Sequence, residues 1–162
     1  MKLALLSLVS AASLLAADKN WPEFRGPRGD GVSTATRLPL NWSEHRNVAW
    51  KTAIHDKGWS SPVIHGDQVW VTTATDDGRR LYAVCLDRAS GRVIHDVLVF
   101  EAEQPALWKR YNSYASPTPV IAGDRVFCHF GNYGTACVGL ADGKVLWKTE
   151  RFKYDPQNGP GA

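Results

Sequence analysis

The chain has 162 residues, of which 44% are hydrophobic and 22% are charged, and its formal net charge is +3. This composition is that of a folded globular protein and excludes the disordered and fibrous classes. The net charge is small and the basic residues are scattered, so we expect no nucleic-acid partner. Three cysteines are too few for a small domain held together by disulfides. Seven tryptophans and many short apolar runs separated by glycine indicate an all-β chain.

The first 17 residues are typical of a secretory signal peptide. Lys2 precedes an uncharged apolar run from Leu3 to Ala17, and small residues end this run before Asp18. The run is shorter than the roughly 20 residues that cross a bilayer as a helix, so we expect no transmembrane helix in the mature chain. The sequence therefore predicts export to the periplasm or the extracellular space. A buried N-terminal helix is the alternative.

Two copies of one sequence unit follow an irregular leader over residues 18–47. The stretch Ser60–Trp70 resembles Ser116–Phe127, and Cys85–Ile94 resembles Cys137–Leu146. We expect four short strands in each copy, separated by turns at Gly-Asp, Ser-Gly or Asp-Gly pairs. Four antiparallel strands in a unit of roughly 50 residues are typical of a β-propeller blade. A β-sandwich is the main alternative, but its strands have no reason to repeat one for one.

The predicted strands of the first copy are residues 62–64, 68–74, 81–86 and 93–97. Residues 48–52 resemble the fourth strand of the second copy and predict a further, closing strand. The predicted parts are a closing strand over 48–54, blades over 58–97 and 114–150, and the start of another inter-blade loop over 151–162.

The third and fourth strands carry a recognisable motif. Tyr82-Ala83 is followed by the turn Asp87–Arg92, and the fourth strand carries His95 in the first copy and Trp147 in the second. These residues resemble the repeat of pyrroloquinoline-quinone-like (PQQ-like) propellers, which has a Tyr-Ala pair, an Asp-x-x-Thr-Gly-Lys turn and a tryptophan on the fourth strand. Residues 21–33 resemble the leader before such propellers in exported proteins of unassigned function. The resemblance implies a quinoprotein-type propeller of seven or eight blades.

The tryptophan of this repeat has a physical role, because its large flat ring can bury one blade against the next. We therefore expect Trp50, His95 and Trp147 to dock between adjacent blades, with His95 filling the space less completely than a tryptophan would.

Two blades and a closing strand are fewer than the four to eight blades that close a propeller. We therefore expect the sequence to be the N-terminal part of a longer protein, whose remaining blades complete the ring. The closing strand would then be the outer strand of the last blade. A ring formed by several copies of this chain is the alternative.

Cys128 and Cys137 lie on either side of a predicted two-residue hairpin loop, Asn132-Tyr133. In that hairpin they would form a non-hydrogen-bonded cross-strand pair, with Cα atoms about 4.5 Å apart. This distance permits a disulfide, and export would favour its formation. Two buried thiols are the alternative, because Cys85 aligns with Cys137 and has no equivalent partner.

The sequence contains no catalytic or metal-binding motif that we recognise. The five histidines have no metal-ligand spacing, and no nucleophile signature occurs. Asp76-Asp77-Gly78 is interpreted as a turn, because the spaced carboxylates of a calcium loop are missing. We therefore predict no catalytic residue and no metal site.

A recognition surface is the better candidate for function. In propellers the loops between strands two and three and those between blades share one face, where ligands bind. The long connection from Glu101 to Tyr114 is rich in aromatic and basic residues, which suit recognition on a rigid scaffold. Packing of these loops over the blades is the alternative. The candidate recognition residues are Trp59, Trp108, Arg110, Tyr111, Asn112, Tyr114 and Tyr133.

Three functions are compatible with these observations. The first is a non-catalytic binding or assembly scaffold, like the outer-membrane assembly factors that the repeat resembles, with an envelope protein or an extracellular ligand as partner. The second is part of a quinoprotein dehydrogenase, for which the resemblance implies PQQ and a calcium ion. Such enzymes often carry adjacent cysteines, and the chain has none. The third is an extracellular module that binds a glycan or a peptide. We favour the first, which needs no cofactor and no enzymatic activity.

Overall fold

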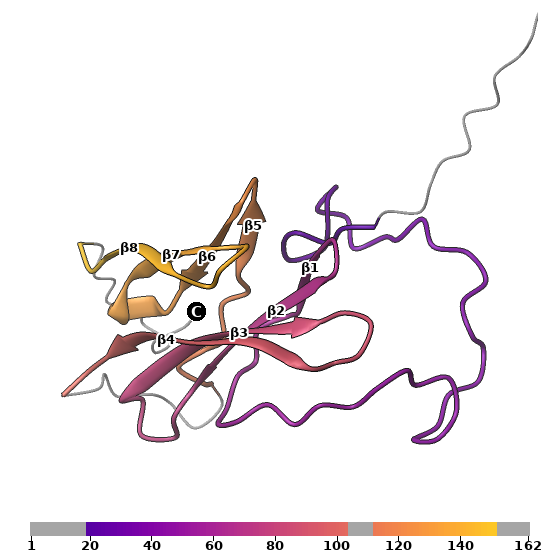
Figure 1. Cartoon of the computed structure of the whole chain (residues 1–162), viewed down its shortest axis with the longest axis horizontal. Coiled ribbons are helices and arrows are strands. Elements are labelled where there is room, and N and C mark those ends of the chain that lie inside the picture. Colours follow the sequence, from indigo (N-terminus) through magenta and orange to yellow (C-terminus); the bar gives the residue numbers. More distant parts are fainter. Residues whose placement is uncertain (1–18, 104–111, 152–162) are drawn as a thin grey trace, which may run out of the picture.

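The structure is a computed structural model that describes residues 19–103 and 112–151. In this part of the chain the strands form two four-stranded antiparallel sheets, and the helical content is a single short 3-10 turn (Figure 1). The predicted all-β class is therefore confirmed. The predicted signal peptide over residues 1–17 lies outside the described residues, as do residues 152–162 of the predicted last loop. Among the described residues, no helix has the length and apolar character needed to cross a membrane.

The first sheet contains four consecutive strands in the order β1-β2-β3-β4. The strands β2 and β3 match the predicted positions within one residue, but β4 continues past the predicted end at Val97. The extension is explained by Val99 and Phe100, which are buried in the apolar core. The four strands are β1 (Val63–His65), β2 (Gln68–Ala74), β3 (Arg80–Asp87) and β4 (Val93–Glu101).

The second sheet has the same order, β5-β6-β7-β8, and the 3-10 turn η1 (Gly131–Tyr133) lies between its second and third strands. Its strands are β5 (Val120–Ala122), β6 (Arg125–His129), β7 (Thr135–Gly139) and β8 (Val145–Thr149).

The two sheets repeat each other down to single backbone hydrogen bonds. Arg88 donates its backbone N–H to Asp67 O at 2.8 Å, and Leu140 makes the equivalent bond to Asp124 O at 2.9 Å. The register of the third and fourth strands shifts after Cys85 in one sheet and after Cys137 in the other. Aligned residues of the two copies therefore occupy equivalent places, including the bulge.

The main apolar core lies between the two sheets. Trp70, Leu81 and Cys85 contribute to it from the first sheet, and Val126 and Cys128 contribute from the second. A smaller cluster on the other face of the first sheet includes residues of the segment before it. The sheets thus stack as successive units, while the described residues form no closed ring.

The leader crosses the first strand of each sheet. Trp21 and Ile64 exchange two backbone N–H···O hydrogen bonds of 2.8 Å, and Pro22 O accepts a third, also of 2.8 Å, from Ile121 N–H. Asn20 Oδ1 accepts the backbone N–H of Gly66 at 2.9 Å. Three consecutive leader residues therefore hold β1 and β5 together at the edge of both sheets.

Residues 48–54, the predicted closing strand, belong to neither of the two sheets. The prediction assigns them to the last blade of the ring, whose other strands are not part of these two sheets, so the closing strand stays a prediction. The segment still packs on the first sheet, where Trp50 and Ile54 join the smaller apolar cluster.

The predicted cross-strand pairing of Cys128 with Cys137 is wrong, and the alternative of two buried thiols agrees with the structure. Cys128 lies opposite Ala136 and Cys137 lies opposite Phe127, and both thiols are free and buried. The last paired residues of β6 and β7 are His129 and Thr135, so the loop that contains η1 comprises residues 130–134. This odd-numbered loop replaces the predicted two-residue loop and shifts the register of the two strands by one residue. A shift of one residue moves a side chain to the other face of a sheet, so the two cysteines point to opposite faces.

Candidate functional site

Trp50 lies against the glycine turn between β3 and β4. Its indole Nε1 donates to Arg88 O at 2.9 Å, and Thr52 Oγ1 donates to Gly91 O at 2.6 Å. A Cβ atom on Gly91 would come within 2.5 Å of the Trp50 ring, and Gly91 has a φ of 73°. Only glycine tolerates both the ring and this backbone conformation.

His95 occupies the equivalent place one unit further along. A Cβ on Gly143, which has a φ of 69°, would lie 2.8 Å from Cγ of His95. The imidazole stacks on Trp70 with ring centroids 5.9 Å apart. Its Nε2 is buried and has no hydrogen-bond partner among the described residues, whereas the Trp50 indole reaches a carbonyl. His95 thus fills the docking position but lacks the hydrogen bond that Trp50 makes to a carbonyl there.

Trp147 has the position on the second sheet that His95 has on the first. Its ring lies 6.1 Å from that of Phe127, as His95 lies beside Trp70. Trp147 is 42% exposed, and Val120 beside Phe127 is also exposed. Among the described residues, this outer face of the second sheet has no third sheet upon it.

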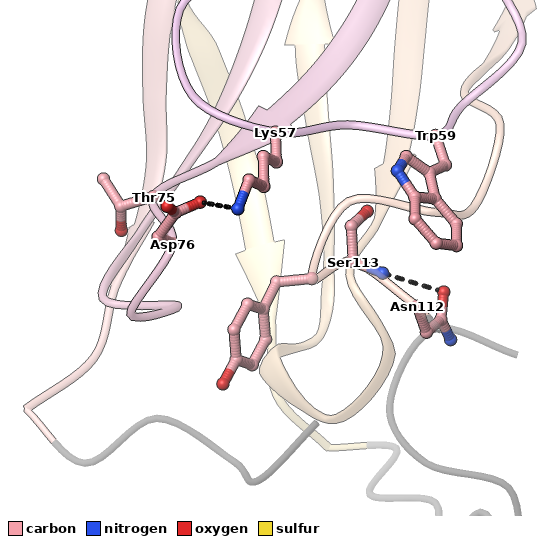
Figure 2. Close-up of a pocket in the computed structure, with 7 residues that line it drawn as sticks. Lys57, Trp59, Thr75, Asp76, Asn112 and Ser113 are labelled. Carbon is pink, nitrogen blue, oxygen red and sulfur yellow. Dashed lines mark hydrogen bonds and ion pairs between the residues drawn. The ribbon is translucent and has the colours of Figure 1, made fainter. Parts of the chain in front are cut away.

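A pocket of about 290 Å³ lies where the two units meet (Figure 2). It contains three of the predicted recognition residues, namely Trp59, Asn112 and Tyr114. A fourth, Tyr133, contacts Tyr114 edge-on at 5.9 Å between ring centroids. Trp108, Arg110 and Tyr111 lie outside the described residues. The remaining lining residues come from loops that were expected to share one face but were not singled out individually, and they are Lys57, Thr75, Asp76 and Ser113.

Three segments position this pocket. Lys57 exchanges backbone N–H···O bonds of 3.0 and 2.9 Å with Ala74, at the end of β2. The backbone N–H of Trp59 donates to Ala115 O at 3.0 Å and so joins the first unit to the second. The ring of Tyr114 covers Gly78, where a Cβ would come within 2.5 Å of it. The pocket walls are therefore fixed by backbone contacts on both sides.

The charges in the pocket are paired. Lys57 Nζ lies 2.9 Å from Asp76 Oδ1, and both side chains are exposed. Figure 2 shows this pair on one side of the pocket and Trp59 on the other. Burial and the nearby charge of Asp77 raise the pKa of Tyr114, which keeps its hydroxyl protonated. Hydrogen bonds from Thr75 Oγ1 and from Arg79 N–H lower the pKa of Asp77.

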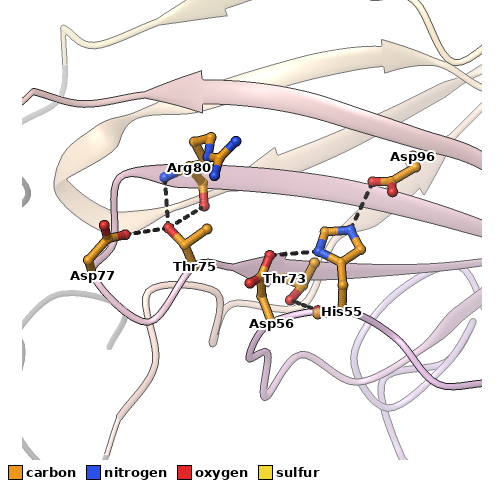
Figure 3. Close-up of polar contacts among 7 residues, drawn as sticks. All are labelled: His55, Asp56, Thr73, Thr75, Asp77, Arg80 and Asp96. Carbon is orange, nitrogen blue, oxygen red and sulfur yellow. Dashed lines mark hydrogen bonds and ion pairs between the residues drawn. The ribbon is translucent and has the colours of Figure 1, made fainter.

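His55 forms a second polar cluster that the sequence did not predict (Figure 3). Its Nδ1 lies 2.6 Å from Asp56 Oδ2 and its Nε2 lies 3.0 Å from Asp96 Oδ1, while its ring meets Tyr82 edge-on at 4.8 Å. Burial lowers the pKa of His55, but hydrogen bonds and charges from the two aspartates outweigh burial, so the pKa is raised overall. The cluster joins the segment before the first sheet to β4.

The described residues contain no group of three or more His, Cys, Asp or Glu side chains arranged to hold a metal ion. They therefore offer no fit for the calcium ion that the quinoprotein alternative requires. Burial raises the pKa of the Cys85 and Cys128 thiols to about 12, which makes both poor nucleophiles.

The fold and the pocket define this chain as a repeat protein of stacked four-stranded β-sheets with a small pocket at the junction of two units. No protein-family model matches the chain, and no curated protein matches it significantly. The resemblance to PQQ-like propellers therefore rests on residues of the chain itself.

Proposed function

We propose that this chain belongs to an exported PQQ-like β-propeller that acts as a non-catalytic binding scaffold, with the junction pocket as its recognition site. The observation that carries the proposal is the pocket itself. It brings Trp59 from the first unit and Tyr114 from the second to one place, on a framework fixed by backbone hydrogen bonds. Aromatic residues held on rigid sheets are typical of recognition sites.

The repeated docking supports the propeller architecture. The same stacking rule applies twice, in the contact of Trp50 with Gly91 and in the contact of His95 with Gly143. By the same rule, Trp147 and Phe127 would receive the glycine turn of a third unit, because they occupy the places of His95 and Trp70. Further units stacked on this face would complete the ring.

The leader favours a scaffold over the quinoprotein alternative. It forms backbone hydrogen bonds to β1 and β5, and in the proposed propeller these first strands would lie next to the axis, where a quinone would have to bind. The partner that we propose is a component of the cell envelope or of the extracellular medium.

The test compares the components that the protein retains from an envelope extract. We use the wild type, Trp59→Ala and Trp42→Ala, the last being a matched control because Trp42 is 69% exposed on the leader. We expect at least one component to bind the wild type and Trp42→Ala but to be lost by Trp59→Ala. An identical set for all three variants would contradict the proposal. So would binding of added PQQ and calcium with dye-linked oxidation of an alcohol or a sugar.

A further inference from the structure

We infer that the junction pocket binds a single ring of a neutral saccharide, an inference that rests on the proposed binding function and specifies its ligand class. Four properties of the pocket carry it, namely an accessible indole, a pair of opposite charges, a small volume and fixed walls.

The indole of Trp59 provides the apolar contact. It is 59% exposed although the ring borders a pocket, and its backbone is held by the bond to Ala115 O. A sugar ring has one face of C–H groups, which packs on an aromatic ring, and an edge of hydroxyl groups. Side chains with a large rigid apolar surface gain the most from such packing, because they lose little conformational entropy.

The polar groups opposite the indole match the hydroxyl edge. Lys57 Nζ supplies hydrogen-bond donors and Asp76 supplies acceptors, with the paired atoms 2.9 Å apart. Adjacent hydroxyl groups need both kinds of partner. Asn112 Oδ1 accepts the backbone N–H of Ser113 at 3.0 Å, which fixes the lower wall near Trp59 (Figure 2).

The paired charges also decide against other ligands. Because Lys57 and Asp76 neutralise each other, the described residues that line the pocket carry no surplus charge to attract an anion or a cation. A peptide that adds to a sheet needs an open strand edge, whereas this pocket is lined by side chains between two units. Its volume of about 290 Å³ is at the small end of ligand pockets and suits one ring more than an extended chain.

The experiment is calorimetric titration of the whole protein with neutral oligosaccharides of glucose, mannose, galactose, xylose and N-acetylglucosamine. Oligogalacturonate and short neutral peptides are the other ligands tested. We expect binding of at least one neutral series, weakened about tenfold or more by Trp59→Ala, since loss of a tryptophan at a binding centre commonly has that effect. Trp42→Ala should bind as the wild type does.

Asp76→Asn provides a second test, because it leaves the Lys57 charge unpaired. We expect this variant to bind oligogalacturonate more tightly than the wild type. The inference is overturned if no neutral oligosaccharide binds, if Trp59→Ala binds as well as the wild type, or if only peptide or acidic sugar binds. If these titrations fail while Trp59→Ala still loses an envelope component, the saccharide inference falls and the scaffold function stands. If both fail, the proposed function falls as well.

Discussion

Gly143 lies directly beneath the ring of His95, so closely that a Cβ atom at position 143 would be 2.8 Å from His95 Cγ. In the first sheet, Gly91 lies beneath Trp50 of the preceding segment in the same way, with 2.5 Å between its Cβ position and the indole ring. Each unit thus presents a glycine turn to one side chain of the unit or segment before it. Together with the shared apolar core and the hydrogen bonds of the leader, this contact stacks the two sheets on each other.

Replacing Gly143 with alanine should destabilise the protein by about 2 kcal/mol or more, because the new methyl group meets His95 and the backbone has a positive φ. Urea unfolding measures this change. Gly123→Ala is the matched control, since Gly123 has a φ of 58° but no atom within 4 Å of its Cβ position. Equal losses of stability for the two variants would show that His95 does not press on the turn.

His95→Trp should stabilise the protein by about 1 kcal/mol. The substitution removes the buried unpaired Nε2, and the indole N–H can donate to Leu140 O, which corresponds to the carbonyl that Trp50 uses. Thermal and urea unfolding test this gain. His95→Phe separates the two effects, because it removes the unpaired nitrogen without adding a donor. A His95→Trp protein no more stable than His95→Phe would refute the equivalent hydrogen bond.

The stability of the folded protein should depend on the protonation of His55. Although burial opposes the charge, Asp56 and Asp96 raise the folded-state pKa above the ordinary value of 6.5. A raised pKa means that the folded state binds the proton more tightly, so the contribution is fully present below pH 6.5 and is lost as the pH rises through the folded-state pKa. The effect is modest, because the side chain is 39% exposed.

Titration of the histidine NMR signals tests this dependence. Asp96→Asn should lower the pKa of His55, while Asp124→Asn, on an exposed turn of the second sheet, should leave it unchanged. If the pKa of His55 is the same in the wild type and in Asp96→Asn, the contact with Asp96 does not raise it.

All three cysteines should titrate as free thiols in denaturant without added reductant, because Cys128 and Cys137 point to opposite faces of the second sheet. In the native protein Cys85 and Cys128 should resist alkylation at pH 8, since burial raises the pKa of each thiol to about 12. A count of one thiol in denaturant would contradict this prediction and support a disulfide between Cys128 and Cys137.

The repeat and its turns could be predicted from the sequence because they depend on local chemistry. Gly91 and Gly143 are needed for positive φ, and residues such as those of β2 favour strands wherever they pack. The hairpin around η1 could not be predicted in the same way. Its glycines permit both a two-residue turn and the longer 3-10 loop. The longer loop shifts the strand register by one residue, which places Cys137 on the opposite face of the sheet from Cys128.

The candidate site was predictable only in part. Trp59 lies in the loop before the first unit, and Asn112 and Tyr114 lie in the aromatic-rich connection between the units, so the sequence indicated all three. Nothing in the sequence indicates that Lys57 pairs with Asp76. That contact arises because the backbone of Lys57 pairs with Ala74 at the end of β2, which brings two loops together. The contact between His55 and Asp96 likewise depends on how the preceding segment packs on β4.

The most direct test of recognition at the junction pocket follows the tryptophan indole N–H signals by NMR in the isotopically labelled protein. The signal of Trp59 is assigned with Trp59→Phe, and the protein is titrated with the oligosaccharides that bind in calorimetry and with the retained envelope component. We predict that the Trp59 signal moves with the bound fraction, while the Trp42 signal stays in place. An unchanged Trp59 signal during binding, or a change at Trp147 instead, would place recognition elsewhere and contradict the assignment of the pocket.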